Sequence, residues 1–425
     1  MRVLHVLHTS LPVICGYSIR SASILRCQRA LGIEVSVVTS PQHPGPAGGV
    51  ETIEGVLHHR SRAYRGSSLP FWREWQVMRT LKHEVDGAIG RFKPDVVHAH
   101  SPVLVGLPAL WASRRRGLPL VYEVRDLWEN ASVDRGKFRE KSLQYRIAQS
   151  VETHLLRRAN AVVTIGEVLR SELGPRVRDE SRLFVVPNGV DAAAFEPVPA
   201  DLERGSDGAG DNDVILYVGT FQPYEGLDLL IRAVPIVSRS RPGVRLVIVG
   251  GSAGAADGAG ARPQAEETRL KALVTELGIG QQVTFTGRVP HDKVNGYYAG
   301  AAVVVYPRVA TKTTALTTPL KPLEAMAMGK AVVASDLAAI RELVHDKTTG
   351  RLFQAGNVED LAARCGELLA DRSARRALGA EAAAWVRRER DWSVVAPRYL
   401  RVYDTARLNQ AGRPPAAVAA EAGRR

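Results

Sequence analysis

The chain has few cysteines and no long hydrophobic run. Its longest uninterrupted apolar stretch, Pro102 to Ala112, is far shorter than the ~20 residues that a membrane-spanning helix needs. The N-terminus lacks a signal-peptide pattern because His5 and His8 interrupt its apolar residues. The cysteines form neither a disulfide framework nor a CxxC metal pair, being only Cys15, Cys27 and Cys365. We therefore expect a soluble chain of the cytosolic type.

Two motifs are also missing. No GxGxxG is present, which argues against a dinucleotide-dependent oxidoreductase. No Asp-x-Asp pair follows a predicted strand, so we expect no metal at the site. His98 and His100 alternate on one strand, and we interpret them mainly as core histidines, although His100 has the alternative of reaching a cleft.

Charge is unevenly distributed along the 425 residues. Lys and Arg number 57 against 44 Asp and Glu, which gives a net charge of +13. Residues 1–190 contain 27 basic and 17 acidic side chains, whereas residues 191–385 contain 21 and 23. Such an excess favours an anionic partner, and it lies in the N-terminal half and the tail.

The segment from Phe71 to Val85 suggests which anionic partner this is. Basic residues alternate there with apolar and aromatic ones, and Trp72 and Trp75 lie three residues apart on one helical face. This pattern is typical of helices at a membrane surface. The alternative is a helix that packs Trp75, Met78 and Leu81 onto a sheet and leaves a solvated basic face. No nucleic-acid-binding motif accompanies the bases, so we expect no nucleic acid partner.

Both halves of the chain repeat one pattern. Short runs of Val and Leu without polar alternation predict strands buried on both faces, and helical segments separate them. This alternation predicts two doubly wound α/β domains, with ligands at the carboxyl ends of the strands. The predicted strands are Val3–His8, Val35–Ser40, Asp95–His100, Leu120–Val124, Ala161–Ile165 and Leu183–Pro187, then Val214–Gly219, Arg245–Gly250, Val283–Gly287, Ala302–Pro307 and Ala331–Ser335.

The domain boundaries are predicted from the composition along the chain. We expect an N-terminal domain over residues 1–190 and a C-terminal domain over 191–390. A helix over 391–409 is expected to pack back on the N-terminal domain, before a disordered tail at 410–425. The Gly-rich stretches 201–213 and 251–264 are predicted to be surface loops.

Two loops could bind a ligand. Gly16 precedes a predicted helix after the first strand, where backbone can approach an anion; an ordinary tight turn is the alternative. Glu324 and Lys321 lie near the start of a helix in PLKPLEAMAMGK. A carboxylate and a cation together suit the ribose and phosphates of a nucleotide diphosphate, although Glu324 could simply satisfy free backbone N–H groups.

The ordered segments LHVLHTSLP, PDVVHAH, VPNGVD, LYVGTF, TGRVPHDKV and PLKPLEAMAMGKAVVASD resemble retaining GT-B glycosyltransferases of glycosyltransferase family 4. The resemblance covers residues 1 to about 405 and is greatest to the branch associated with exopolysaccharide clusters and the exosortase A system. It implies a nucleotide-sugar donor bound mainly by the C-terminal domain and a saccharide acceptor, which we expect to be polyprenyl-diphosphate-linked, bound by the N-terminal domain.

The resemblance also implies roles for individual residues. Arg125 and Asp126 match a pair near the reacting sugar; a structural ion pair is the alternative. Asn188 and Asp191 match the crossing between the domains and are interpreted as structural. The implied donor-binding residues are Gly16, Thr220, Gly287, Arg288, Val289, Leu320, Lys321 and Glu324.

The chain departs from the family in two places. Relatives usually carry a second glutamate before the one at Glu324, and here Leu316 lies eight residues earlier. Thr220 and Glu225 stand where many relatives have an Arg and a Lys that neutralise the diphosphate. We expect Arg308 and Lys321 to replace that pair, because an unpaired buried charge is costly. The alternatives are an arginine on a solvated loop and a lysine without a role at the helix start.

The resemblance implies a retaining hexosyltransferase without a cofactor, and the lack of an Asp-x-Asp motif favours metal independence. We expect it in the cytoplasm, with peripheral attachment to the inner face of the cytoplasmic membrane as an option. The alternatives are a catalytically silent GT-B subunit that binds nucleotide or lipid, and a GT-B sugar-nucleotide epimerase. Donor sugar, base, acceptor linkage and oligomeric state do not follow from the sequence.

Overall fold

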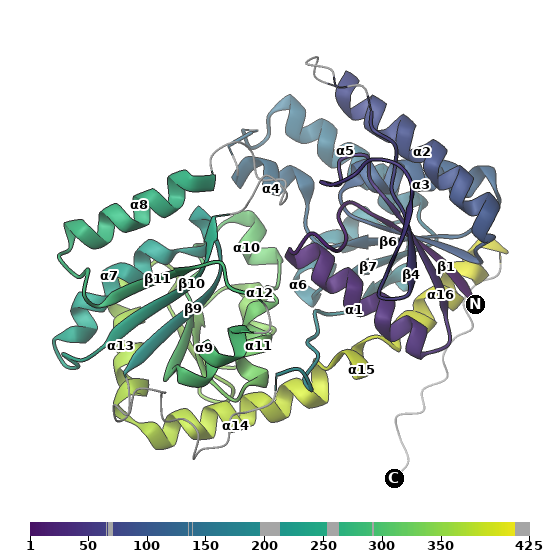
Figure 1. Ribbon diagram of the computed structural model, residues 1–425. Coiled ribbons are helices and arrows are strands. Elements are labelled where there is room, and N and C mark those ends of the chain that lie inside the picture. Colours follow the sequence, from purple (N-terminus) through teal and green to yellow (C-terminus); the bar gives the residue numbers. More distant parts are fainter. Residues whose placement is uncertain are drawn as a thin grey trace, which may run out of the picture.

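The computed structural model describes residues 1–64, 66, 71–134, 136–137, 139–195, 213–252, 263–290 and 293–412. Figure 1 shows two α/β domains side by side, each with a central sheet flanked by helices. The predicted Gly-rich loops lie largely outside the described residues, as do residues 413–425 of the predicted tail.

The N-terminal domain is built on an eight-stranded sheet. Its order is β3-β4-β2-β1-β5-β6-β7-β8, and all neighbouring strands are parallel except β3 and β4. The central strands are buried on both faces, as their continuous runs of Val and Leu predict. The strands are β1 (Arg2–Leu7), β2 (Glu34–Thr39), β3 (Val50–Ile53), β4 (Val56–His59), β5 (Val96–His100), β6 (Leu120–Val124), β7 (Ala161–Thr164) and β8 (Leu183–Val185).

Helices connect these strands. Most are not closed by a side-chain N-cap, but Ser142 accepts a hydrogen bond from the Tyr145 amide at the start of α5. The helices are α1 (Gly16–Ala30), α2 (Trp72–Phe92), α3 (Val103–Arg115), α4 (Trp128–Asp134), α5 (Leu143–Arg158), α6 (Glu167–Leu173), and the 3-10 turns η1 (Gly174–Arg176) and η2 (Glu180–Arg182).

The C-terminal domain has a six-stranded, wholly parallel sheet in the order β11-β10-β9-β12-β13-β14. Its strands are β9 (Val214–Phe221), β10 (Arg245–Ser252), β11 (Val283–Gly287), β12 (Val303–Tyr306), β13 (Ala331–Ser335) and β14 (Arg351–Phe353). Its helices are η3 (Pro223–Glu225), α7 (Leu227–Ser238), α8 (Pro263–Glu276), α9 (Val294–Gly300), α10 (Lys312–Leu316), α11 (Lys321–Ala327), α12 (Ala338–Arg341), α13 (Val358–Ala370) and α14 (Arg372–Glu389).

The chain then returns to the N-terminal domain. The helices α15 (Trp392–Val395) and α16 (Arg398–Gln410) follow α14 and lie under the first sheet (Figure 1). Apolar side chains of this segment, such as Val402, pack against Val3, Val96 and Val121 of the sheet. One face of the N-terminal sheet is therefore covered by the C-terminal end of the chain.

The two doubly wound sheets confirm the predicted fold class. All eleven predicted strands are present within a residue or two of their expected ends. The β3–β4 hairpin and β14 were not predicted, because each strand has only three or four residues and β3 is largely exposed.

Candidate active site at the domain interface

Segments from both domains meet at the start of α1. Gly16 is the first residue of α1 and is exposed. A methyl group on its Cα would lie 3.9 Å from the Leu320 side chain of the other domain. Because Leu320 directly precedes α11, the structure brings the predicted residues Gly16, Leu320 and Lys321 to one place.

The start of α11 carries a carboxylate held by a cation and a tyrosine. Lys321 Nζ lies 3.1 and 2.9 Å from the two carboxylate oxygens of Glu324. The buried Tyr298 hydroxyl donates to Glu324 at 3.3 Å, and Tyr306 donates to the Lys321 carbonyl at 2.9 Å. Glu324 is only 4% exposed, so this carboxylate is fixed in position.

Arg308 lies just beyond β12 and is also paired. Its guanidinium donates to the Thr317 carbonyl at 3.0 Å and lies 3.4 Å from the Glu225 carboxylate. The ring of Tyr224 packs against it, 5.7 Å away. Its buried Nε has no hydrogen-bond partner among the described residues. The two predicted phosphate-binding cations, Arg308 and Lys321, are thus each balanced by a carboxylate.

The other predicted donor residues lie at the carboxyl ends of β9 and β11, which flank β10. Thr220 is exposed near the end of β9, and Gly287 ends β11 with a left-handed φ of 72°. Arg288 lies over β10, where a methyl on Gly251 would come within 3.3 Å of its side chain. Val289 packs against the domain core. Glu324 lies in α11, which follows β12 in the chain, so these four residues and Glu324 all lie at or beyond the ends of strands of one parallel sheet and toward the same edge.

Arg125 follows β6 and is 4% exposed. It pairs with Glu123 at 2.8 Å, and it donates to the Tyr17 carbonyl at 2.7 Å. Asp126 is half-buried. Burial, and then the charge of Asp126 and its hydrogen bond, raises the pKa of Tyr17 well above its usual value. The role of Arg125 and Asp126 near the sugar stays a prediction.

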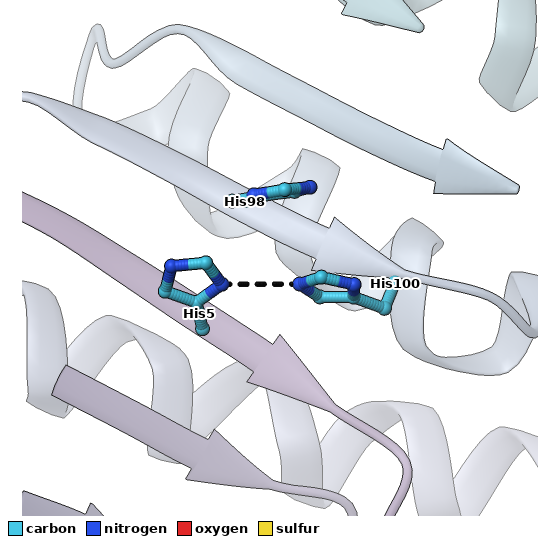
Figure 2. A group of neighbouring side chains, drawn as sticks. All are labelled: His5, His98 and His100. Atoms are coloured by element: carbon cyan, nitrogen blue, oxygen red, sulfur yellow. Dashed lines mark hydrogen bonds between the residues drawn. The ribbon is translucent and has the colours of Figure 1, made fainter. Parts of the chain in front are cut away.

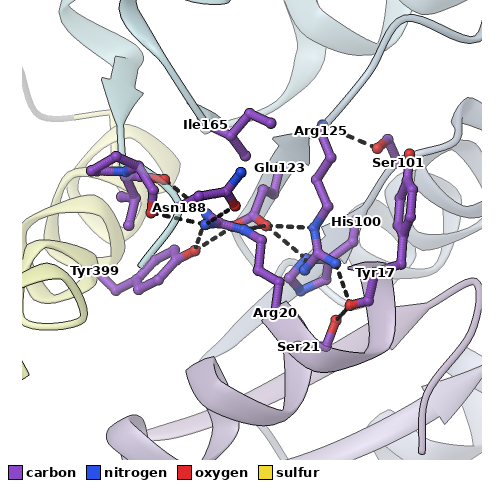
Figure 3. Close-up of polar contacts among 12 residues, drawn as sticks. Tyr17, Arg20, Ser21, His100, Ser101, Glu123, Arg125, Ile165, Asn188 and Tyr399 are labelled. Carbon is purple, nitrogen blue, oxygen red and sulfur yellow. Dashed lines mark hydrogen bonds and ion pairs between the residues drawn. The ribbon is translucent and has the colours of Figure 1, made fainter. Parts of the chain in front are cut away.

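Glu123 is the hub of a buried network that the sequence did not reveal (Figure 3). Arg20, Arg125 and the Tyr399 hydroxyl all donate to its carboxylate. Burial alone would raise the pKa of Glu123, but the guanidinium groups of Arg20 and Arg125 hold it well below its usual range. One feature of the sequence could have indicated this network: a glutamate lies within the otherwise apolar strand LVYEV, and a buried charge requires a partner.

Arg20 of α1 uses all of its donor capacity. Besides Glu123 it donates to the carbonyls of Val186 and Pro187, each at 2.8 Å. It also donates to Asn188 Oδ1 at 3.0 Å and to the Tyr399 hydroxyl at 3.2 Å. Five acceptors for five N–H groups satisfy a guanidinium completely. Arg20 is therefore a structural residue.

Asn188 continues the network into the C-terminal domain. Its amide donates to the Thr318 carbonyl at 2.7 Å and to the Thr318 hydroxyl at 3.0 Å. Thr318 lies two residues before Leu320. Asp191 pairs with Arg26 at 3.1 Å. A continuous chain of hydrogen bonds thus runs from α16, through Glu123 and Arg20, to the segment that leads into α11.

Three histidines lie beside this network. Figure 2 shows His5, His98 and His100 grouped across β1 and β5, with His5 Nδ1 and His100 Nε2 3.1 Å apart. All are at most 1% exposed. Burial lowers the pKa of His5 to about 3, and burial with the Arg125 charge lowers that of His100 to about 4. The rings are therefore neutral at pH 7.

These histidines are the group in the described structure whose side chains come close enough to ligate a metal. Two features do not suit a cation. The rings of His98 and His100 stack, with centroids 4.2 Å apart and planes 23° apart, so their lone pairs do not converge. Arg20 and Arg125 also bring two positive charges to the single carboxylate beside them. The group is a core cluster, as the sequence favoured.

Comparison with known proteins agrees with this geometry. Residues 16–189 match the glycosyl transferase 4-like domain, and residues 201–385 match the glycosyl transferases group 1 family. A D-inositol 3-phosphate glycosyltransferase of Acidothermus cellulolyticus is 29% identical over 83% of this chain and 78% of its own length.

A GDP-mannose-dependent phosphatidylinositol monomannoside mannosyltransferase of Mycobacterium tuberculosis is 29% identical over 61% of this chain and 66% of its own. The sucrose-phosphate synthase of Thermosynechococcus elongatus has the same fold, with a TM-score of 0.77 at 22% identity over 95% of this chain and 98% of its own. The chain therefore belongs to the GT-B glycosyltransferases.

Proposed function

We propose that the protein is a retaining, metal-independent glycosyltransferase of family 4 that moves a sugar from a nucleotide-sugar to a lipid-linked saccharide in exopolysaccharide or surface-glycan synthesis. The observation that carries the proposal is the meeting of Gly16 with the start of α11, where Lys321 and Glu324 are fixed side by side. This places a carboxylate and a cation opposite a helix start, between two glycosyltransferase domains.

The donor would bind on the C-terminal side. Glu324 accepts the ribose hydroxyls, and the backbone of Gly287 to Val289 lies at the same sheet edge to contact the base. Lys321 directs hydrogen bonds to both oxygens of Glu324, and an ammonium has three donors, so one remains for a phosphate. Arg308 keeps its unpartnered Nε for the same purpose.

Catalysis would rest on charge stabilisation. Negative charge develops on the departing diphosphate, which takes the proton of the incoming acceptor hydroxyl on the same face of the sugar. Lys321, Arg308 and the N–H groups at the start of the 15-residue helix α1 stabilise that charge. Gly16 matters here because it leaves the approach to those N–H groups open.

The acceptor would come from a membrane surface. Trp72 and Trp75 of α2 stack with ring centroids 4.8 Å apart and are 50% and 40% exposed. Trp75 is therefore not packed into the core, whereas Val77 and Leu81 are. Arg79 lies over the Trp75 ring. Paired aromatics with adjacent bases suit the headgroup region on the cytoplasmic side.

Among the described helices none has the length and apolarity to cross a membrane. We therefore propose peripheral attachment. Binding of the wild-type protein to vesicles that contain anionic lipid should weaken as salt is raised and fall further in a Trp72→Ala/Trp75→Ala variant. Vesicle binding that changes neither with salt nor in this variant would contradict the membrane proposal.

The donor proposal is tested by thermal shift with UDP, GDP, ADP and their sugars. Ligand at 100 times its dissociation constant adds ~2.7 kcal/mol to stability. Glu324→Gln should lower nucleotide affinity about tenfold or more, since it removes an ionised acceptor. Glu359→Gln, an exposed carboxylate of the same domain, serves as the matched control and should bind normally. No shift with any nucleotide would end the donor proposal.

The replacement cations need a separate test. Lys321→Ala and Arg308→Ala should each reduce donor affinity and turnover, because they leave the diphosphate charge less balanced. If both variants retain wild-type affinity and turnover, these residues do not replace the missing Arg and Lys.

One observation favours a second candidate, a silent GT-B subunit that binds nucleotide or lipid. Glu225 and Glu324 already neutralise Arg308 and Lys321, so the donor side carries little net positive charge. Nucleotide binding without donor hydrolysis or transfer would identify this candidate. Isomerisation of a donor sugar without an acceptor would instead identify an epimerase.

A further inference from the structure

A recess lined by arginines lies at the amino edge of the N-terminal sheet. Strands β6, β7 and β8 are parallel, and the chain is basic just before each of them. The recess encloses about 470 Å³, and its arginines are Arg114, Arg157, Arg158, Arg178 and Arg182. Because Gly16 and Arg125 follow the carboxyl ends of strands, this arginine recess lies at the edge opposite the candidate active site.

The charges in the arginine recess are poorly balanced. The side chains of Arg114, Arg157 and Arg178 make no hydrogen bond or ion pair in the part of the chain that the structure describes. Arg158 contacts the His154 ring at 3.0 Å. The buried Nε of Arg182 lies 3.6 Å from an Asp179 carboxylate oxygen, too far for a hydrogen bond, and makes no other hydrogen bond among the described residues. Five guanidinium groups thus face one carboxylate.

Helix dipoles explain only part of this arrangement. Arg114 ends α3, and Arg157 and Arg158 end α5, where positive charge complements the helix C-terminus. Arg178 and Arg182 come instead from the loop and the 3-10 turn before β8. Their presence in the same recess is not accounted for by the helix ends.

Asn160 and Gln410 also line the recess, and hydrogen bonds tie them to neighbouring segments. Asn160 Nδ2 donates to Gln410 at 3.1 Å, and Gln410 donates to the Gly117 carbonyl at 3.2 Å. Asn409 donates to the Asn160 carbonyl at 2.9 Å. These bonds fix the amide groups between the arginines, so the recess has a defined shape.

We propose that the arginine recess binds a ligand with two or more phosphoryl groups, at a site separate from the donor site. Guanidinium groups match phosphate oxygens in charge and in their paired N–H geometry. A volume of about 470 Å³ suits a small phosphorylated molecule or a lipid phosphate headgroup. The site does not depend on the proposed donor chemistry.

The test uses the full-length protein and inorganic tripolyphosphate. Calorimetric titration should show binding to wild type, and Arg157→Gln/Arg178→Gln should weaken it about tenfold or more. Neither arginine has an intramolecular partner among the described residues, so the substitutions break no contact seen in the structure. Arg232→Gln/Arg239→Gln removes the same charge from exposed positions on the other domain and should bind like wild type.

A second arm separates the source of the phosphate. Phosphatidylcholine vesicles containing phosphatidylinositol 4,5-bisphosphate should displace tripolyphosphate from the wild type if the ligand is a headgroup; tripolyphosphate binding that such vesicles do not displace supports a soluble ligand. Equal tripolyphosphate affinity in the recess variant, the control variant and the wild type would overturn the proposal. Donor turnover by the recess variant should equal that of the wild type, so failure here is distinct from failure at the donor site.

Discussion

The two domains share a fold but fill their interiors differently. The C-terminal domain has one continuous hydrophobic cluster, from Val190 to Val386, around Val-rich strands. The N-terminal domain buries Glu123 with two arginines and three histidines at the centre of its sheet. Removing one polar partner from a buried ionic network leaves a buried charge or polar group unsatisfied, which costs free energy beyond the lost contact. The N-terminal domain should therefore be the more sensitive to loss of a single polar group.

The buried network of the N-terminal domain also explains why α16 returns to that domain. Tyr399 and Tyr403 of α16 supply hydroxyl groups to Glu123, His98 and Gln28. The N-terminal network is thus completed by residues that follow the whole C-terminal domain in sequence. We therefore expect the stability of the N-terminal domain to depend on the C-terminal part of the chain, and not the reverse.

The largest effect is expected from Glu123→Gln. Arg20 and Arg125 would then be buried without a counter-charge, and stability should fall by about 3–5 kcal/mol. Urea unfolding measures this change. Glu34→Gln, which removes an exposed pair with Arg2, should cost less than about 1 kcal/mol. Similar losses in both variants would contradict the hub role.

Tyr399→Phe should lower stability less than Glu123→Gln does. It removes one donor to Glu123 and one acceptor for Arg20, and we expect a loss of about 1–3 kcal/mol. Tyr217→Phe in the C-terminal domain, which loses a bond to the Thr220 carbonyl, is the matched comparison. A smaller loss in Tyr399→Phe than in Tyr217→Phe would refute the contrast between the domains.

Acid should destabilise the N-terminal domain first. The folded pKa values of His5 and His100 are depressed to about 3 and about 4, below the ordinary value of 6.5. The stability that these neutral histidines contribute to the folded state is present above pH ~6.5. It is lost as the pH falls toward their folded pKa values. Hydrogen exchange at mildly acidic pH should rise in β1 and β5 before β9 and β12. Uniform protection in both sheets would contradict this expectation.

The smallest effect concerns Glu152 of α5. Burial, and then the charge of Glu129, raises its pKa from 4.5 to about 8. The native state holds the proton more tightly, so stability falls as the pH rises from about 5 to 8. Glu152→Gln keeps an acceptor for the Tyr122 hydroxyl and should raise the melting temperature at pH 8 but not at pH 5. An equal change at both pH values would argue against a protonated Glu152.

The sequence predicted the elements better than the contacts between them. Val and Leu runs identify strands locally, and the position of Glu324 near a helix start was correct. The hub could not be predicted, because Arg20 and Tyr399 lie 103 and 276 residues from Glu123. The pairing of Arg308 with Glu225 was missed for the same reason: neighbouring strands bring together side chains that are distant in sequence.

The most direct test of the central claim is donor turnover by the full-length protein. We expect release of nucleoside diphosphate from one of UDP-, GDP- or ADP-sugars, without added metal and in the presence of chelator, and its loss in Glu324→Gln but not in Glu359→Gln. With an acceptor, the product should keep the anomeric configuration of the donor. Absence of nucleotide release from every donor, or equal release by Glu324→Gln and wild type, would contradict the account.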